Sequence, residues 1–347
     1  MRTPTLRRPG RGAADELLKL VTKIQTTRPI QDDDPRWPDI AELVIAHRLA
    51  GLAHEHWELP REVKRTLRRE RARLVQVHAV QERLLARVLK ALRPLPVLLL
   101  KGAANEGLYA SPELRPRSDT DLLVSHVHFG EAHARLLQLG LVHHPRTRHT
   151  REKSPVWHER TFLEENTGQS IDLHQGLLQP ERMKLTADLL FADSRPALGR
   201  ARHVRIPSIA DSWLIGALSL AAKELAVPLV LAVDLALLSA QLEARVLAQR
   251  AKQVDLVRAA FLASSWLSHV TLAGRIVHAH YAVEWGIELT RHLRVPKALS
   301  MALDLIAGRY ALDRQQPSRP ARLVRKALFI DRATDAAWFA LRTLSGQ

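Results

Sequence analysis

The chain has 347 residues, with 52 lysines and arginines against 36 acidic residues, a formal net charge of +16 and no cysteine. The absence of cysteine excludes disulfide bonds and cysteine-ligated zinc, and it fits a reducing cytoplasm, where we expect the protein to be. The positive charge favours a polyanionic partner, namely a nucleotide, a nucleic acid or an acidic membrane surface, although an arginine-rich codon composition would produce the same balance.

The chain is expected to be globular rather than membrane-embedded. Residues 1–12 are basic and no apolar stretch follows them, so we expect a disordered arm rather than a secretory signal. The longest apolar run, from Trp213 to Ala240, is interrupted by charged residues and therefore predicts buried helices and no membrane span.

Residues 13–93 predict an N-terminal helical region. Apolar residues recur at helical spacing over 17–24 and over 40–52, and Asp39 is the expected N-cap of the second of these helices. A long helix is expected over 60–92, with its many charges on a solvated face.

Residues 94–206 predict a small mixed β-sheet. We expect, in chain order, a strand over 97–100, a short helix over 102–108, a strand over 120–124, a helix over 129–139 and a hairpin of strands over 156–165 and 169–173. Asn166-Thr167-Gly168 supplies the turn chemistry of the hairpin. Residues 207–347 predict a C-terminal helical domain, in which Ser208 or Asp211 caps the first helix. The expected fold class is therefore α+β, a small mixed sheet flanked by two helical regions.

Two aspartates open the second expected strand. Because strand side chains alternate between faces, Asp119 and Asp121 project from the same side of the sheet. Two carboxylates held this close repel each other unless a positive charge lies between them. A hard divalent cation, magnesium or manganese, that carries a nucleoside triphosphate is the usual partner of such a pair.

A third carboxylate follows on a later strand. Ser170, Asp172 and His174 share one face of that strand, while the residues between them point into the core. If the strand lies beside the first aspartates, Asp172 completes a metal-binding triad and accepts a proton. His174 either orients a phosphate or the acceptor, or fills the edge of the cleft. The structural alternative makes Asp119 a turn cap and leaves Asp121 facing solvent.

A turn with a lysine and a glycine follows the first expected strand. Gly102 lets the backbone approach phosphate oxygens, and the helix after it offers unpaired N–H groups. Lys101, Arg115 and Arg117 are near in sequence and would neutralise a triphosphate, unless they are ordinary surface charges. These four residues and His174 are the expected nucleotide-binding residues.

The combination of these features resembles a known family. A strand followed by Lys101-Gly102, then Tyr109, an arginine before the Asp-x-Asp pair and the later Asp172-Leu173-His174 are similar to the bacterial uncharacterised nucleotidyltransferase family, which belongs to the DNA polymerase beta superfamily. The resemblance covers residues 97–178 and extends into 208–238.

The resemblance implies a nucleotidyltransferase core, two-metal magnesium chemistry and a triad of Asp119, Asp121 and Asp172. Similar proteins carry a histidine early in the tail helix, where this chain reads Ser219-Leu220-Ala221-Ala222-Lys223, so a substrate contact is expected to differ there. The gap between Gly102 and Asp119 is also longer than in minimal members of the superfamily.

The expected function is transfer of a nucleoside monophosphate from an NTP, with ATP the expected donor, to an unidentified small molecule, peptide, protein or RNA. Serine hydrolases, P-loop ATPases and dinucleotide enzymes are disfavoured because their motifs are absent from the sequence. The alternative is a non-catalytic basic module on the same fold that binds nucleic acid or a partner protein. A third hypothesis, within the enzyme class, is a toxin-like enzyme that modifies tRNA or a protein.

Overall fold

The computed structural model describes most of the chain between Trp37 and His269. The described ranges are 37–144, 159–177, 184–222 and 227–269, together with Pro35, Glu288, Leu289, His292 and Leu293. The expected arm over residues 1–12, the expected helix over 17–24 and everything after residue 293 lie outside these ranges.

Three helices in the described part of the chain precede the sheet. They are α2 (Trp37–Ala46), α3 (Ala50–His56) and α4 (Arg61–Ala91). The single helix expected over 40–52 is broken in the structure, because Arg48 has a left-handed backbone conformation, with φ of 61°, that ends α2. Since α2 begins at Trp37, Asp39 lies in its first turn and is not its N-cap.

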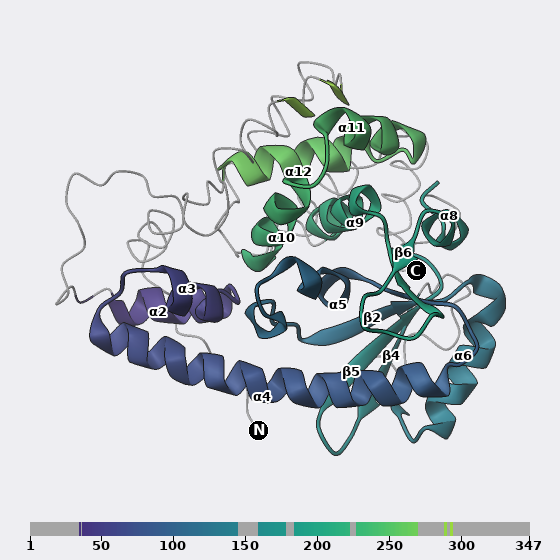
Figure 1. The fold of residues 1–347 in the computed structure, drawn as a ribbon, viewed down its shortest axis with the longest axis horizontal. Coiled ribbons are helices and arrows are strands. Elements are labelled where there is room, and N and C mark those ends of the chain that lie inside the picture. The colour runs from purple at the N-terminus through teal and green to yellow at the C-terminus, as the bar shows by residue number, and fades with distance from the viewer. Residues whose placement is uncertain are drawn as a thin grey trace, which may run out of the picture.

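The long helix expected over 60–92 is α4, and it contributes side chains to two hydrophobic clusters. Leu67 and Leu74 pack in the same hydrophobic cluster as α2 and α3, whereas Leu85 and Val88 pack against the sheet. Figure 1 shows α4 running below α2 and α3 and then crossing in front of β4 and β5. One helix therefore fixes the position of the N-terminal helices relative to the sheet.

Seven strands of the described chain form one mixed sheet in the order β3-β4-β5-β2-β1-β7-β6. They are β1 (Val97–Leu99), β2 (Asp119–Leu123), β3 (Val142–His143), β4 (Glu159–Glu164), β5 (Gln169–His174), β6 (Arg195–Pro196) and β7 (Val204–Ile206). β2 pairs antiparallel with β1 and parallel with β5, and β4 and β5 form the expected hairpin. Gly168 in its turn has φ of 68°, which glycine adopts at little cost.

The two faces of the sheet are covered differently. Leu99 and Leu122 pack with α4 and with α6 (His126–Gln138) on one face. Leu98 and Leu123 alternate to the opposite face, where they join the cluster formed by the flanking helices. Because the alternation continues along β2, its two aspartates lie on this second face.

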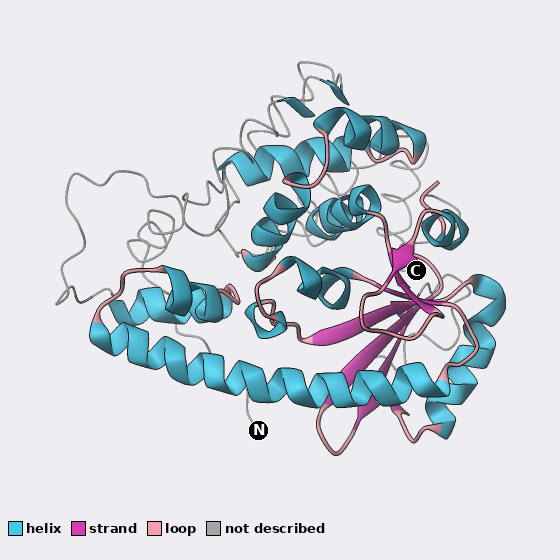
Figure 2. Ribbon diagram, in the orientation of Figure 1, coloured by secondary structure: helices cyan, strands magenta, loops and turns pink. Residues whose placement is uncertain are grey.

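Among the described residues, five further helices follow the hairpin. They are α8 (Ala187–Ala192), α9 (Ile209–Ala222), α10 (Val230–Ser239), α11 (Ala244–Gln253) and α12 (Val257–His269). Ser208 caps α9, since its Oγ accepts a hydrogen bond of 3.1 Å from the N–H of Asp211. Helices α9 to α12 share one hydrophobic cluster with α2 and α3, and Figure 2 shows them gathered on one side of the strands.

The expected α+β class, a small mixed sheet flanked by N-terminal and C-terminal helices, is confirmed. Within the described ranges, no helix combines the length and the apolar character that crossing a membrane requires.

Candidate active site

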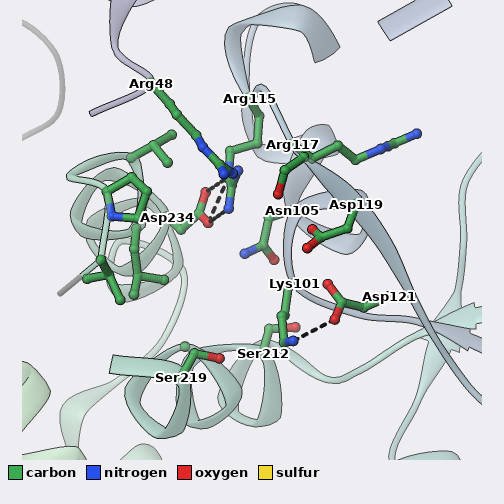
Figure 3. Close-up of a pocket in the computed structure, with 17 residues that line it drawn as sticks. Arg48, Lys101, Asn105, Arg115, Arg117, Asp119, Asp121, Ser212, Ser219 and Asp234 are labelled. Atoms are coloured by element: carbon green, nitrogen blue, oxygen red, sulfur yellow. Dashed lines mark hydrogen bonds and ion pairs between the residues drawn. The ribbon is translucent and has the colours of Figure 1, made fainter. Parts of the chain in front are cut away.

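The aspartates of β2 and β5 come together as their strand positions predict. The two strands run parallel with Asp121 directly opposite Asp172, so both side chains lie on the same face of the sheet. The ligand atoms of Asp121, Asp172 and His174 all lie within 4.8 Å of one another. Asp119 is outside that set but lines the same pocket as Asp121, and Figure 3 shows both carboxylates pointing into it.

Asp172 carries a buried oxygen that the described protein leaves without a partner. Its Oδ1 is buried and accepts no hydrogen bond from the described residues. Burial, together with the negative charges of Asp121 and Asp119, raises the pKa of Asp172 to about 6. An unsatisfied carboxylate oxygen costs free energy, and a hard cation bound between these carboxylates would remove that cost. The donor set therefore fits a divalent cation that prefers oxygen ligands.

Asp121 is the most strongly held of the three aspartates. The ammonium Nζ of Lys101 donates to its Oδ1 at 2.5 Å, and Nε2 of His174 lies 3.0 Å from the same oxygen. Burial alone would raise the pKa of Asp121, but Lys101 and His174 hold it well below its usual range. The carboxylate is therefore ionised at neutral pH.

Lys101 itself is placed by an unusual backbone conformation. Its φ is 48°, in the left-handed region that costs a residue with a Cβ about 1 kcal/mol. Burial would lower the pKa of its ammonium, but Asp121 and Asp119 raise it, so the side chain keeps its charge. A charged side chain held in a strained conformation beside two carboxylates is typical of a functional position.

Gly102 lines the same pocket as Asp119 and Asp121, so its contact with a phosphate stays a prediction, and its small size also serves packing. A Cβ at this residue would lie 3.2 Å from the Cβ of Arg117, which is a tight contact. Its φ is not in the left-handed region, which Lys101 occupies instead. The helix that follows, α5 (Lys101–Asn105), has only five residues. Gly102 thus lets α5 pack closely on the segment that leads into β2.

A pocket opens beside the aspartates. It encloses about 710 Å³ of space outside the protein atoms, including open solvent. One wall is α5 and the start of β2, and the opposite wall is α9 and α10, which contribute small residues such as Ser212, Gly216 and Ser219. Arg48 lines the pocket as well, although it belongs to the N-terminal helices. Its position follows from the break between α2 and α3, which the sequence pattern did not indicate.

Arg115 lines this pocket, but its guanidinium is engaged by the protein. Its Nε and Nη2 donate to the carboxylate of Asp234 in α10 at 2.6 to 2.8 Å, and its Nη1 donates to the carbonyl of Pro116 at 2.9 Å. The Oη of Tyr109 donates to the same carboxylate at 2.6 Å. Burial raises the pKa of Tyr109 well above its usual value, so the phenol stays protonated. Arg115 therefore joins the sheet region to α10.

Arg117 lines the pocket too, but its guanidinium turns away from it. Its guanidinium is buried and forms ion pairs with Glu82 of α4 and with Glu106, and Gln81 of α4 donates to its carbonyl oxygen at 3.0 Å. Figure 3 shows the guanidinium on the side away from Asp119. The structure therefore does not bring the guanidinium of Arg117 together with the aspartates. Binding of a triphosphate by the two arginines stays a prediction.

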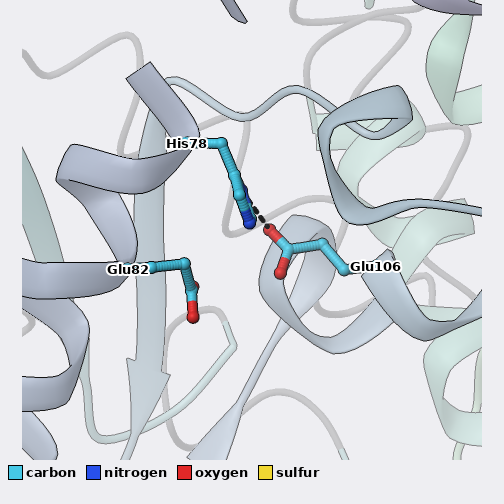
Figure 4. A group of neighbouring side chains, drawn as sticks. All are labelled: His78, Glu82 and Glu106. Atoms are coloured by element: carbon cyan, nitrogen blue, oxygen red, sulfur yellow. Dashed lines mark ion pairs between the residues drawn. The ribbon is translucent and has the colours of Figure 1, made fainter. Parts of the chain in front are cut away.

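The glutamates that hold Arg117 form a second acidic cluster with His78, which Figure 4 shows. Two guanidinium groups already bind this cluster. Nη2 of Arg117 lies 2.8 Å from Oε1 of Glu82, and Nη2 of Arg200 lies 2.5 Å from Oε2 of Glu82. Burial raises the pKa of Glu106 to about 7. A metal ion would have to displace these arginines, so we interpret the cluster as a buried ion-pair network.

His174 lies behind the aspartates rather than at the mouth of the pocket. It is buried, and its Nδ1 lies 3.5 Å from Oε2 of Glu159, on the adjacent strand β4. Glu159 and Asp121 therefore lie near the two ring nitrogens of His174. His174 therefore contacts Asp121 directly, and its role toward a phosphate or an acceptor stays a prediction. The sequence did not single out Glu159, although its place within the strand expected over 156–165 was the available signal.

The chain was also compared with known proteins. No match was found among curated proteins, and none among solved structures. The family model described as uncharacterised nucleotidyltransferase matches residues 33–271, which is more than half of the chain. The matched range contains all three aspartates and every residue that lines the pocket. The chain therefore belongs to the uncharacterised nucleotidyltransferase family.

Proposed function

We propose that the protein transfers a nucleoside monophosphate from an NTP, with ATP the expected donor, to an acceptor nucleophile in a magnesium-dependent reaction. The observation that carries the proposal is the pairing of Asp121 with Asp172 across two parallel strands, with an unsatisfied oxygen on Asp172. This is the arrangement expected of a carboxylate site that a cation completes. Family membership supports the same class of reaction.

Asp119, Asp121 and Asp172 are the residues that would hold magnesium or manganese. When bound, the cation supplies charge that stabilises the pentavalent phosphate and lowers the pKa of the attacking hydroxyl. His174 keeps the Asp121 carboxylate in place through its 3.0 Å contact. Asp119 approaches from the pocket side, so a nucleotide in the pocket meets this carboxylate directly.

Side chains of the protein stabilise the negative charge that develops during the transfer and accept the proton of the acceptor. The acceptor oxygen forms a bond to the α-phosphorus, the bond from that phosphorus to the bridging oxygen breaks, and pyrophosphate leaves. Lys101 exchanges its contact with Asp121 for a phosphate oxygen and stabilises the added negative charge. Asp172 accepts the proton of the acceptor hydroxyl.

The test is transfer from labelled NTPs to components of a cell extract, with magnesium or manganese present. Asp119→Asn and Asp172→Asn are expected to reduce transfer about a hundredfold or more, because each removes a charge from the site. Asp188→Asn is the matched control, since Asp188 is exposed in the first turn of α8 and lines no part of the pocket. Transfer that persists undiminished in both site variants would contradict the proposal.

A further inference from the structure

We infer that the side-chain amide of Asn105 binds a ribose hydroxyl of the nucleotide, so that the pocket distinguishes a ribonucleotide from its deoxy counterpart. The inference rests on the proposed function and names the residue that recognises the sugar of the donor. Asn105 is the last residue of α5 and lines the same pocket as Asp119 and Asp121. Figure 3 shows its amide pointing into this pocket.

The amide of Asn105 is buried and has no hydrogen-bond partner in the described part of the chain. The residue is 5% exposed and precedes the short 3-10 helix η1 (Glu106–Leu108), where an asparagine would ordinarily serve as a cap. Its side chain makes no capping hydrogen bond to η1, and Figure 3 draws no interaction between it and the other residues that line the pocket. A buried amide without a partner costs free energy, so the fold alone does not explain this asparagine.

The chemistry of the amide restricts the group that it can bind. A primary amide donates through its NH2 group and accepts through its oxygen, so it matches a ligand group that does both. The oxygens of an ionised phosphate only accept, and Lys101, whose Nζ is 2.5 Å from Asp121, supplies a charged donor for them. A hydroxyl group donates and accepts through one atom. Asn105 is therefore suited to a hydroxyl rather than to the triphosphate.

The position of Asn105 favours the ribose over the base. The reacting α-phosphate must lie at the aspartates, which Lys101 contacts from the first residue of α5. Asn105 ends the same short helix, and one helical turn advances about 5.4 Å. The ribose is joined directly to the α-phosphate, and its hydroxyls are the nearest groups of the nucleotide that both donate and accept. The base lies beyond the sugar and is farther from the aspartates.

Calorimetric titration of the full chain, with magnesium and without acceptor, tests the inference. The probes are α,β-methylene ATP and its 2′-deoxy and 3′-deoxy counterparts, which cannot release pyrophosphate and each lack one hydroxyl. The wild-type chain is expected to bind one deoxy probe roughly tenfold more weakly than the ribonucleotide, because the buried amide then loses its partner. Asn105→Ala and Asn105→Leu are expected to bind all three probes within about twofold of one another, at the weaker affinity.

Urea unfolding separates a binding amide from a structural one. Since the amide has no partner within the described fold, Asn105→Ala is expected to unfold at the wild-type urea concentration or above it. A clear fall in that midpoint would show that the amide supports the fold and would contradict the inference. Gln76→Ala, at an exposed position of α4 that does not line the pocket, is the matched control and is expected to keep the wild-type affinities.

The binding data separate this inference from the proposed function. Equal affinity of the wild type for the three probes, or a preference that persists in both Asn105 variants, would overturn the inference alone. Equal losses for all three probes in the variants would also overturn it, because the amide would then contact the base or a phosphate. A wild-type chain that binds none of the probes would overturn the proposed function as well.

Discussion

At the scale of single residues, two substitutions of Lys101 distinguish the strain of its left-handed backbone from the function of its ammonium group. Alanine and glycine at position 101 both remove the ammonium, but only alanine must adopt the left-handed backbone. We expect Lys101→Gly to be more stable than Lys101→Ala by about 1 kcal/mol in urea unfolding, with both variants equally impaired in nucleotide transfer.

Asn105, which is also in α5 but has φ of −95°, supplies the control for this comparison. At that position the order is expected to reverse, with alanine more stable than glycine by roughly 0.5–1 kcal/mol. If alanine is more stable than glycine at position 101 as well, the backbone at Lys101 is not strained. A Lys101→Gly variant with wild-type activity would show that the ammonium is not used.

The aspartates were predictable from the sequence because strand alternation is a local rule. Asp119 and Asp121 fall on one face from their spacing alone, and Asp172 follows once its strand is recognised. The partners of Arg115 and Arg117 were not predictable, because Asp234 and Glu82 are distant in the chain and reach these arginines only through the tertiary fold. Arg48 was missed for the same reason.

At the scale of elements, the pair of Arg115 and Asp234 joins the start of β2 to α10. Both side chains are almost fully buried, with 7% and 1% of their surface exposed. Asp234→Ala leaves a buried guanidinium without its carboxylate, so we expect the free energy of unfolding to fall by about 3–5 kcal/mol. The double variant Arg115→Met, Asp234→Leu is expected to recover part of that loss. Urea unfolding of Arg115→Met, of Asp234→Leu and of the double variant gives the coupling energy directly.

A double variant that is less stable than Asp234→Ala would contradict this account. In that case the two side chains contribute packing rather than a charge pair. Tyr109→Phe removes only one of the hydrogen bonds to Asp234 and is expected to cost about 1 kcal/mol.

The buried ion-pair network of Arg117, Glu82 and Glu106 predicts that the free energy of unfolding depends on pH. The pKa of Glu106 is raised from 4.5 to about 7 by burial. Between these pH values the folded protein binds more protons at this carboxyl than the unfolded chain does, so its contribution to stability is complete below pH 4.5 and is lost as the pH rises through 7. We expect the unfolding free energy of the wild type to fall more steeply over this range than that of Glu106→Gln, by up to about 3 kcal/mol.

Urea unfolding at a series of pH values checks the difference. Glu165→Gln, at an exposed position in the hairpin turn, is the matched control and is expected to follow the wild type. Identical pH profiles for the wild type and Glu106→Gln would show that Glu106 keeps its ordinary pKa beside Arg117.

The elements themselves were largely predictable, and their ends were not. The long helix, the central strands and the β4–β5 hairpin follow from apolar periodicity and turn residues. The short strands β3, β6 and β7 have two or three residues each, which is too few for a period to be read. The break at Arg48 depends on packing against α10 rather than on a glycine or proline, so no local signal marks it.

At the scale of the whole molecule, the net charge of +16 acts on any anionic ligand. We expect the association rate of an NTP, measured by stopped-flow fluorescence, to fall several-fold between about 50 mM and about 300 mM salt, because screening shortens the range of the positive field. The dissociation rate is expected to change much less. An association rate independent of salt would show that the charge is too evenly spread to steer the ligand.

The dependence of binding on magnesium and on Asp121 separates the enzyme from the alternative of a basic binding module. Exposed basic residues lie along the first half of α4, for example Arg61, Lys64 and Arg68. A binding module predicts salt-sensitive binding of RNA or DNA that needs neither magnesium nor Asp121. The proposed enzyme predicts nucleotide binding that depends on both. Asp121→Asn, assayed with each ligand, distinguishes the two.

The shared core of the N-terminal and C-terminal helices has a consequence for how the protein is made. One hydrophobic cluster contains side chains of α2 and α3 together with those of α9 to α12, and the pocket takes walls from both groups. During synthesis, the strands that carry the aspartates leave the ribosome before α9 to α12, which cover them. The charged face of the sheet is therefore exposed to solvent until these helices have been made. The nascent chain therefore gains affinity for its nucleotide late, once the segment bearing Asp234 docks onto helices that were made first.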